Sequence, residues 1–103
     1  MLECGIMIVL TVYVTLKPET IDPAIDACRI VRSHSITEHG CERYDFYQSP
    51  DDKAKVVFVE EWSSKADLEL HFQQKAFQEF VATMTPFYQS PSEIRIFESS
   101  LLG

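Results

Sequence analysis

The chain has 103 residues, of which 46% are hydrophobic and 24% are charged, which is an ordinary composition for a soluble globular domain. At this length about two-thirds of the unfolded chain's surface can be buried, so we expect one domain. Sixteen Asp and Glu against nine Lys and Arg give a net charge of −7, and the basic residues are scattered singly. No stretch is long and apolar enough for a membrane span. We therefore expect neither nucleic acid nor membrane as a partner.

Three cysteines, Cys4, Cys28 and Cys41, are odd in number and lack the paired spacing of a zinc site or a disulfide framework. We expect reduced thiols in a cytoplasmic protein. The apolar opening lacks the basic start and the small-residue cleavage site of a signal peptide. The regular hydrophobic pattern begins at Met7, so the prediction is a domain over 7–99, an N-terminal extension over 1–6 and a C-terminal tail over 100–103.

The first half of the chain predicts a strand, a helix and a hairpin. Hydrophobic residues alternate over 7–16, which is typical of a strand. Asp22 before Pro23 predicts a helix N-terminus, and Gly40 predicts the end of that helix. The β runs 41–48 and 55–62 flank a turn-rich segment, so they are expected to pair as a hairpin.

The second half predicts a broken helical region and a last strand. Ser64 and Asp67 have the spacing of a capping box that opens a helix, and a second helical stretch follows a break near 73–75. A loop over 86–91 leads to a strand over 93–98. The order β-α-β-β-α-β predicts a ferredoxin-like α+β sandwich, with an antiparallel sheet covered by helices on one face.

The uncovered face of this sheet is expected to be apolar, because strand parity places Val9, Tyr13, Val57 and Val59 on it. A large exposed apolar patch usually marks an interface, and a self-complementary sheet face suits a two-fold dimer. We therefore predict a homodimer.

Several kinds of site are excluded by their missing signatures. Glycine occurs only at positions 5, 40 and 103, so neither a dinucleotide fingerprint nor a phosphate-binding loop is present. His34 and His39 are five residues apart on the predicted helix, so they cannot both face one metal ion. No serine stands in the motif of a hydrolase nucleophile. We expect no metal site.

Two polar residues interrupt apolar patterns and could carry chemistry. Glu60 shares strand parity with Phe58 and Trp62, so it should point toward the helices, where burial would raise its pKa; the alternative is an edge residue that reaches solvent. His71 lies at the border of an apolar helix stripe, where it could serve as a base or be structural. Aromatic side chains that could wall a pocket include Trp62, Tyr44 and Phe80.

The chain resembles the antibiotic biosynthesis monooxygenase family over about residues 7–98. The segments that carry the resemblance are EHGCERYDFY (38–47), VEEW (59–62), the segment 64–72 that ends in His-Phe, and the helix 77–81. The resemblance implies a dimeric α+β barrel with a pocket between the sheet and the helices of each subunit. Some members oxygenate quinols or aromatic polyketides with molecular oxygen and without flavin, haem or metal, so no cofactor is expected.

The resemblance implies a cofactor-independent monooxygenase of a small aromatic substrate. His71 would be the base and Glu60 its orienter, and the expected substrate-binding residues are Trp62, Tyr44, Phe80 and Val12.

Two alternatives stay open at this point. Some relatives isomerise a phosphorylated autoinducer sugar, and His71 and Glu60 fit that branch, but Arg43 and Arg95 are the available phosphate ligands on strands. The other alternative is a non-catalytic dimeric module that binds a hydrophobic ligand. Haem degradation is disfavoured, because Val12, His71 and Val81 stand where that branch has its Asn, Trp and His.

Overall fold

The chain folds in the predicted order, with its second helical region divided in two. The computed structural model describes residues 6–102. Its strands and helices are β1 (Met7–Thr15), α1 (Ile21–Ser35), β2 (Cys41–Gln48), β3 (Lys55–Trp62), α2 (Lys65–Gln73), α3 (Lys75–Met84) and β4 (Glu93–Ser99). Two short 3-10 helices, η1 (Pro18–Thr20) and η2 (Thr85–Phe87), precede α1 and follow α3.

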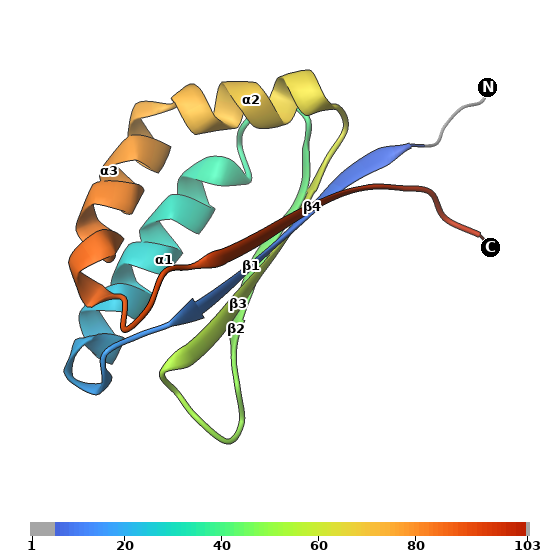
Figure 1. Cartoon of the computed structure of the whole chain (residues 1–103). Helices are drawn as coiled ribbons and strands as arrows, with labels where there is room; N and C mark the ends of the chain where they lie inside the picture. The colour runs from blue at the N-terminus through green and yellow to red at the C-terminus, as the bar shows by residue number, and fades with distance from the viewer. Residues whose placement is uncertain (1–5, 103) are drawn as a thin grey trace.

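The four strands form one antiparallel sheet in the order β2-β3-β1-β4. The three α-helices lie on the same side of this sheet, and its other side is bare (Figure 1). The ferredoxin-like α+β architecture is therefore confirmed.

The core lies between the sheet and the helices. Alternation along β1 and β3 turns Leu10, Val14, Val56 and Phe58 toward the helices, where all four are buried. The facing stripe of α1 repeats at helical spacing and consists of Ala24, Ile25, Cys28, Val31 and Ser35. Strand parity was thus correctly predicted.

The predicted boundaries of α1 are wrong at both ends. The helix begins at Ile21, after Thr20, and Pro23 lies in its first turn. Backbone N–H groups in a first turn have no partner within the helix, so the missing N–H of proline costs no hydrogen bond there. The helix ends at Ser35, five residues before the predicted stop. The Thr37 side chain favours the end of the helix, because its hydroxyl donates a hydrogen bond to the carbonyl of His34 at 2.6 Å, a carbonyl that a longer helix would use for a backbone bond.

Gly40 ends the turn that follows α1 and not the helix itself. Its φ is +82°, and an added Cβ would lie 2.3 Å from the carboxyl of Asp67. Only glycine fits both demands. Glu38 lies in this same turn, and its N–H donates a hydrogen bond to the carbonyl of Ser35 at 3.0 Å.

The helices leave the helix-side face of β4 uncovered. Ile94 and Ile96 pair with Val12 and Leu10, so they share the core face of the sheet. They are nevertheless 56% and 53% exposed. The edge strand β4 thus presents apolar side chains that the single chain does not bury.

The described cysteines, Cys28 and Cys41, are free thiols. Burial raises the pKa of Cys28 to about 12 and that of Cys41 to about 11, because desolvation disfavours the thiolate. Neither is a nucleophile near neutral pH. Cys4 lies outside the described residues, as does most of the predicted N-terminal extension. Across 6–102, no helix has both the length and the apolar character needed to cross a membrane.

Candidate active site

His71 occupies the last turn of α2 and is 1% exposed. The helix is capped as predicted, since the N–H of Asp67 donates to the Ser64 hydroxyl at 3.1 Å. Four aromatic rings surround the imidazole, at centroid distances of 4.7 Å for Trp62, 5.0 Å for Phe77, 5.6 Å for Tyr44 and 5.8 Å for Phe72. The imidazole is therefore held in an apolar, water-poor setting.

Glu38 supplies the polar partner of this ring. Its Oε1 lies 2.9 Å from Nδ1 of His71, and its side chain is 10% exposed. A carboxylate only accepts hydrogen bonds, so the neutral ring carries its hydrogen on Nδ1. The other nitrogen, Nε2, is buried and has no hydrogen-bond partner among the described residues. Its lone pair is therefore not used by any described residue.

The protonation state of His71 suits a base. Desolvation lowers the pKa of His71 below its ordinary value of 6.5, and the nearby Glu38 only partly opposes that shift. The ring is therefore neutral at neutral pH. A neutral imidazole can accept a proton at Nε2, and the carboxylate at Nδ1 stabilises the imidazolium that forms.

Glu60 lies on the helix-facing side of β3, as predicted, and is 3% exposed. Its Oε1 accepts a hydrogen bond from Nε1 of Trp62 at 3.0 Å. Desolvation raises the pKa of Glu60 to about 7; the Trp62 bond opposes this shift and the charge of Glu38 adds to it. Glu60 is thus poised to gain or lose a proton near neutrality.

The structure brings Glu60 and His71 to one indole and not to each other. Both contact Trp62, and the two side chains share no hydrogen bond. The position at Nδ1 of His71, which the sequence suggested for Glu60, is occupied by Glu38.

The predicted pocket walls are brought together in part. Trp62 and Tyr44 are buried against His71. Phe80 packs on Phe58 at 5.8 Å, and Phe58 in turn contacts Tyr44, so two rings separate Phe80 from His71 along this series of contacts. Val12 is half-buried against the core.

Three residues of the site, Glu38, Phe72 and Phe77, are missing from the sequence prediction. Of the four rings around His71, which we call the aromatic cluster, Phe72 and Phe77 are partly exposed, so they form its boundary with solvent. They flank Gln74, whose extended backbone separates α2 from α3. The break before residue 75 signalled this junction. No local signal linked Glu38 to His71, because 33 residues separate them.

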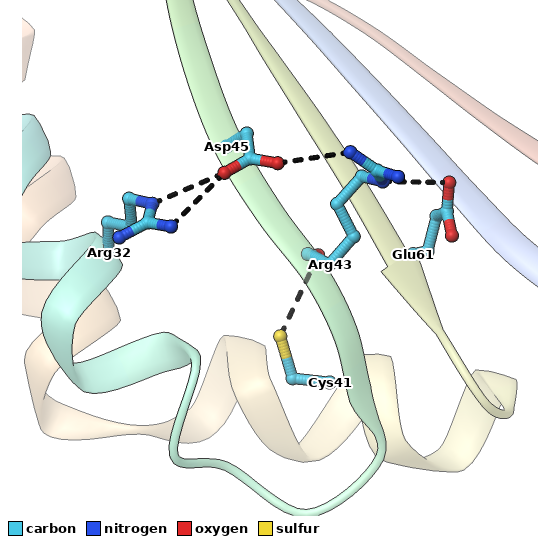
Figure 2. A network of polar contacts seen from close by, with 5 residues as sticks. All are labelled: Arg32, Cys41, Arg43, Asp45 and Glu61. Carbon is cyan, nitrogen blue, oxygen red and sulfur yellow. Dashed lines mark hydrogen bonds and ion pairs between the residues drawn. The ribbon is translucent and has the colours of Figure 1, made fainter.

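The arginines considered as phosphate ligands are already paired with carboxylates. Arg43 contacts Glu61 and Asp45 at 3.2 Å each, and Asp45 also contacts Arg32 of α1 at 3.2 Å (Figure 2). Arg95 pairs with Glu93. These pairs lie away from His71, since Arg43 and Arg95 are on β2 and β4 and both are exposed.

The side of the sheet that no helix covers, which we call the open sheet face, carries a groove of about 520 Å³ near the β2–β3 turn. Tyr13, Tyr47 and Lys55 are among its lining residues, and none of the six predicted site residues lines it. Within residues 6–102, no three His, Cys, Asp or Glu side chains converge as metal ligands would.

The sequence matches the model of the family described as antibiotic biosynthesis monooxygenase over residues 7–83. The chain belongs to this family. The matched range runs from the start of β1 to the penultimate residue of α3, and it includes Glu38, Glu60, Trp62 and His71.

Two relatives extend this result. The uncharacterized protein sll1783 of Synechocystis is 31% identical over 91 residues, which are 88% of this chain and 62% of that protein. The chain thus spans less than two-thirds of that relative. The Bacillus subtilis protein YcnE, whose name marks it as a candidate monooxygenase, is 28% identical over 88 residues, 85% of this chain and 93% of YcnE.

Solved structures agree with the fold. A protein of Nitrosomonas europaea, described as a candidate antibiotic biosynthesis monooxygenase, superposes with a TM-score of 0.89 at 25% identity, covering 96% of this chain and 95% of its own. A conserved protein of Methanosarcina mazei superposes with a TM-score of 0.86 at 23% identity, covering 89% and 91%. The second likeness shows the shared fold alone.

Proposed function

We propose that the protein oxygenates a small electron-rich aromatic molecule, such as a quinol, with molecular oxygen and without a cofactor. The observation that carries the proposal is the paired state of His71. Glu38 holds Nδ1 at 2.9 Å, while the buried Nε2 is left free among aromatic rings. This is the arrangement that a general base for a phenolic hydroxyl requires.

The reaction balances without an external reductant, because a quinol and O2 together contain the atoms of a hydroxyquinone and one water. Nε2 of His71 takes the phenolic proton, and the phenolate passes one electron to O2. The superoxide and aryl radical combine at a ring carbon, and a proton completes the hydroperoxide. Loss of water then breaks the O–O bond and removes the C–H proton, so one oxygen atom stays in the product.

The aromatic surroundings favour this chemistry in two ways. Trp62 and Tyr44 would stack against the substrate ring and hold it beside Nε2. Exclusion of water keeps the phenolate unsolvated, which makes it a stronger reductant. Substrate entry requires displacement of Phe72 and Phe77 at the junction of α2 and α3, because the ring of His71 is otherwise enclosed.

The isomerase alternative is less well supported. A phosphorylated sugar needs cationic ligands beside the catalytic pair. Arg43 is engaged by Asp45 and Glu61, and Arg95 by Glu93, all of them outside the aromatic cluster. If Arg43 or Arg95 bound a phosphate, it would have to give up its present ion pairs with these carboxylates.

We also propose that the active protein is a homodimer built on the open sheet face. Tyr13 and Phe97 are exposed on that face, and Val57 and Val59 are only half-buried. Charged side chains border these apolar residues: Arg43 and its partners lie on β2 and β3, and Arg95 lies over the Tyr13 ring, 5.5 Å from its centroid. An apolar centre with a polar rim is the usual composition of a protein interface.

Oxygen uptake with a panel of quinols, measured on protein stripped of metals, tests the proposed activity. Binding is followed in parallel through the fluorescence of Trp62, the single tryptophan of the chain. Uptake with release of a hydroxyquinone supports the proposal. Quenching of Trp62 by quinols without oxygen uptake would instead indicate a ligand-binding module.

A further inference from the structure

We propose that Glu38 and His34 connect His71 to solvent as a proton relay, which rests on the proposed role of His71 as the base. The three side chains form a continuous line of contacts. Oε1 of Glu38 lies 2.9 Å from Nδ1 of His71, and Oε2 lies 3.3 Å from Nε2 of His34. Side-chain exposure rises along this line from 1% at His71 through 10% at Glu38 to 44% at His34.

The local fold builds this line from the end of α1. His34 lies in the last turn of the helix. The chain leaves the helix after Ser35, and the N–H of Thr37 donates to the carbonyl of His34 at 3.0 Å. The following residue, Glu38, thus turns back between His34 and His71.

Two buried polar atoms of this group have no hydrogen-bond partner among the described residues. They are Nε2 of His71, where substrate would bind, and Oε2 of Glu38, where His34 approaches. Unpaired buried polar atoms are costly, and such an atom calls for an explanation. A relay explains both, because each is an acceptor at a point where the proton enters or is passed on.

The relay solves a difficulty of a closed site. A proton that stays on Nε2 beside the phenolate would return to it before O2 is reduced. Instead, the Nδ1 proton of the imidazolium passes to Oε1 of Glu38, rotation of the carboxyl presents it to His34, and His34 releases it to water. A proton returns along the same path when the peroxide is protonated, so no net proton is gained or lost.

The other titratable groups around His71 offer no comparable route. Tyr44 of β2 touches the ring, but desolvation raises the pKa of its hydroxyl. Glu60 of β3 is buried and bonded to Trp62. Cys41 at the start of β2 has a pKa raised to about 11. Among the described residues, Glu38 is therefore the polar side chain that connects His71 to solvent.

Kinetics of the variant His34→Gln test the relay. With the quinol that the wild type oxygenates, kcat at low buffer concentration should fall about 10-fold or more, since transfer of the proton to solvent is slowed. Imidazole added at increasing concentration should restore kcat without changing KM. The matched control is His39→Gln, because the His39 side chain is 91% exposed and, within residues 6–102, its polar contact is with Asp67. A kcat for His34→Gln equal to that of the control at every buffer concentration would overturn the relay.

A second measurement works without turnover and separates the relay from the oxygenase proposal. In ¹⁵N-labelled, substrate-free protein, the Nδ1 proton of His71 should exchange with water about 10-fold more slowly in His34→Gln than in wild type or His39→Gln. If wild type consumed no oxygen but this slowing occurred, the oxygenase proposal would fail and the relay would stand. Equal exchange rates in all three proteins would overturn the relay even if oxygen were consumed.

Discussion

The Glu38 carboxylate lies 2.9 Å from Nδ1 of His71, although 33 residues separate the two along the chain. This one contact fixes which imidazole nitrogen is available for chemistry, because a carboxylate at Nδ1 leaves the lone pair on Nε2. Glu38 reaches this position because α1 ends at Ser35. The end of a helix thus decides the chemistry of a side chain on another helix.

The variant His71→Ala should lower the rate of quinol oxygenation by about 10²-fold or more, because a positioned general base contributes 10²–10⁴-fold. Glu38→Gln should lose about 10-fold, since the amide still occupies the site but no longer stabilises the imidazolium. Glu60→Gln should have the smallest effect of the three. Steady-state oxygen uptake measures all three rates, and circular dichroism checks that each variant is folded. The opposite order, with Glu60→Gln inactive and His71→Ala active, would make Glu60 the base.

The variant Glu60→Gln should become more stable relative to wild type as the pH rises. The pKa of Glu60 is raised from 4.5 to about 7 by burial, so the folded state keeps a proton that the unfolded state loses. The contribution of Glu60 to stability is therefore fully present below pH 4.5 and is lost as the pH rises through 7. The expected gain for Glu60→Gln is about 3 kcal/mol at pH 8 and close to zero at pH 4.

Urea unfolding followed by Trp62 fluorescence, at one fixed protein concentration, gives both values. The amide oxygen of Gln can still accept the hydrogen bond of Trp62, so the comparison isolates the charge. A stability difference that does not change between pH 4 and pH 8 would show that Glu60 is not desolvated as described.

The variant Tyr13→Asp should weaken the homodimer, because it removes an exposed aromatic ring from the open sheet face, together with the stacking of Arg95, whose Cζ lies 5.5 Å from the ring centroid. Analytical ultracentrifugation at micromolar concentration should give about 24 kDa for wild type, twice the 11.9 kDa of the chain, and a smaller mass for the variant. Ile30→Asp is the matched control, since Ile30 is an exposed apolar residue on α1, away from that face. A wild type that sediments as a monomer would remove the interface argument.

The variant Gly40→Ala should destabilise the protein by about 1–3 kcal/mol, because a left-handed backbone and a Cβ clash are both introduced. The φ of +82° and the 2.3 Å approach to Asp67 are the two causes. The strained turn also carries Glu38, so oxygenase activity should fall together with stability. Thermal unfolding and oxygen uptake measure the two effects. Unchanged stability would mean that the turn can relax without loss.

The sequence predicts the features of the fold and the site that have local or strictly periodic causes. Strand parity predicts Glu60 on the helix-facing side, because side chains alternate along a strand. The spacing of Ser64 and Asp67 predicts the cap of α2, because the two residues are three apart. The break between α2 and α3 was visible in the apolar spacing. Each of these depends on a few neighbouring residues.

The parts that the sequence does not predict depend on contacts across the fold. Gly40 looked like a helix end, but the φ > 0 it provides is used by a turn, and the helix stops earlier. That shift moves Glu38 off the helix and toward His71. Phe77, and not Phe80, contacts His71, because the break at Gln74 reorients α3 by an amount that periodicity does not reveal.

The role of His71 as the base of a cofactor-independent oxygenase is tested by oxygenation of a quinol by metal-free protein under ¹⁸O2, with wild type and His71→Ala compared. For the wild type we expect one ¹⁸O atom in the hydroxyquinone and one in water, and for the variant a rate at least about 10²-fold lower. Product that contains no ¹⁸O, or a variant as fast as wild type, would contradict this role.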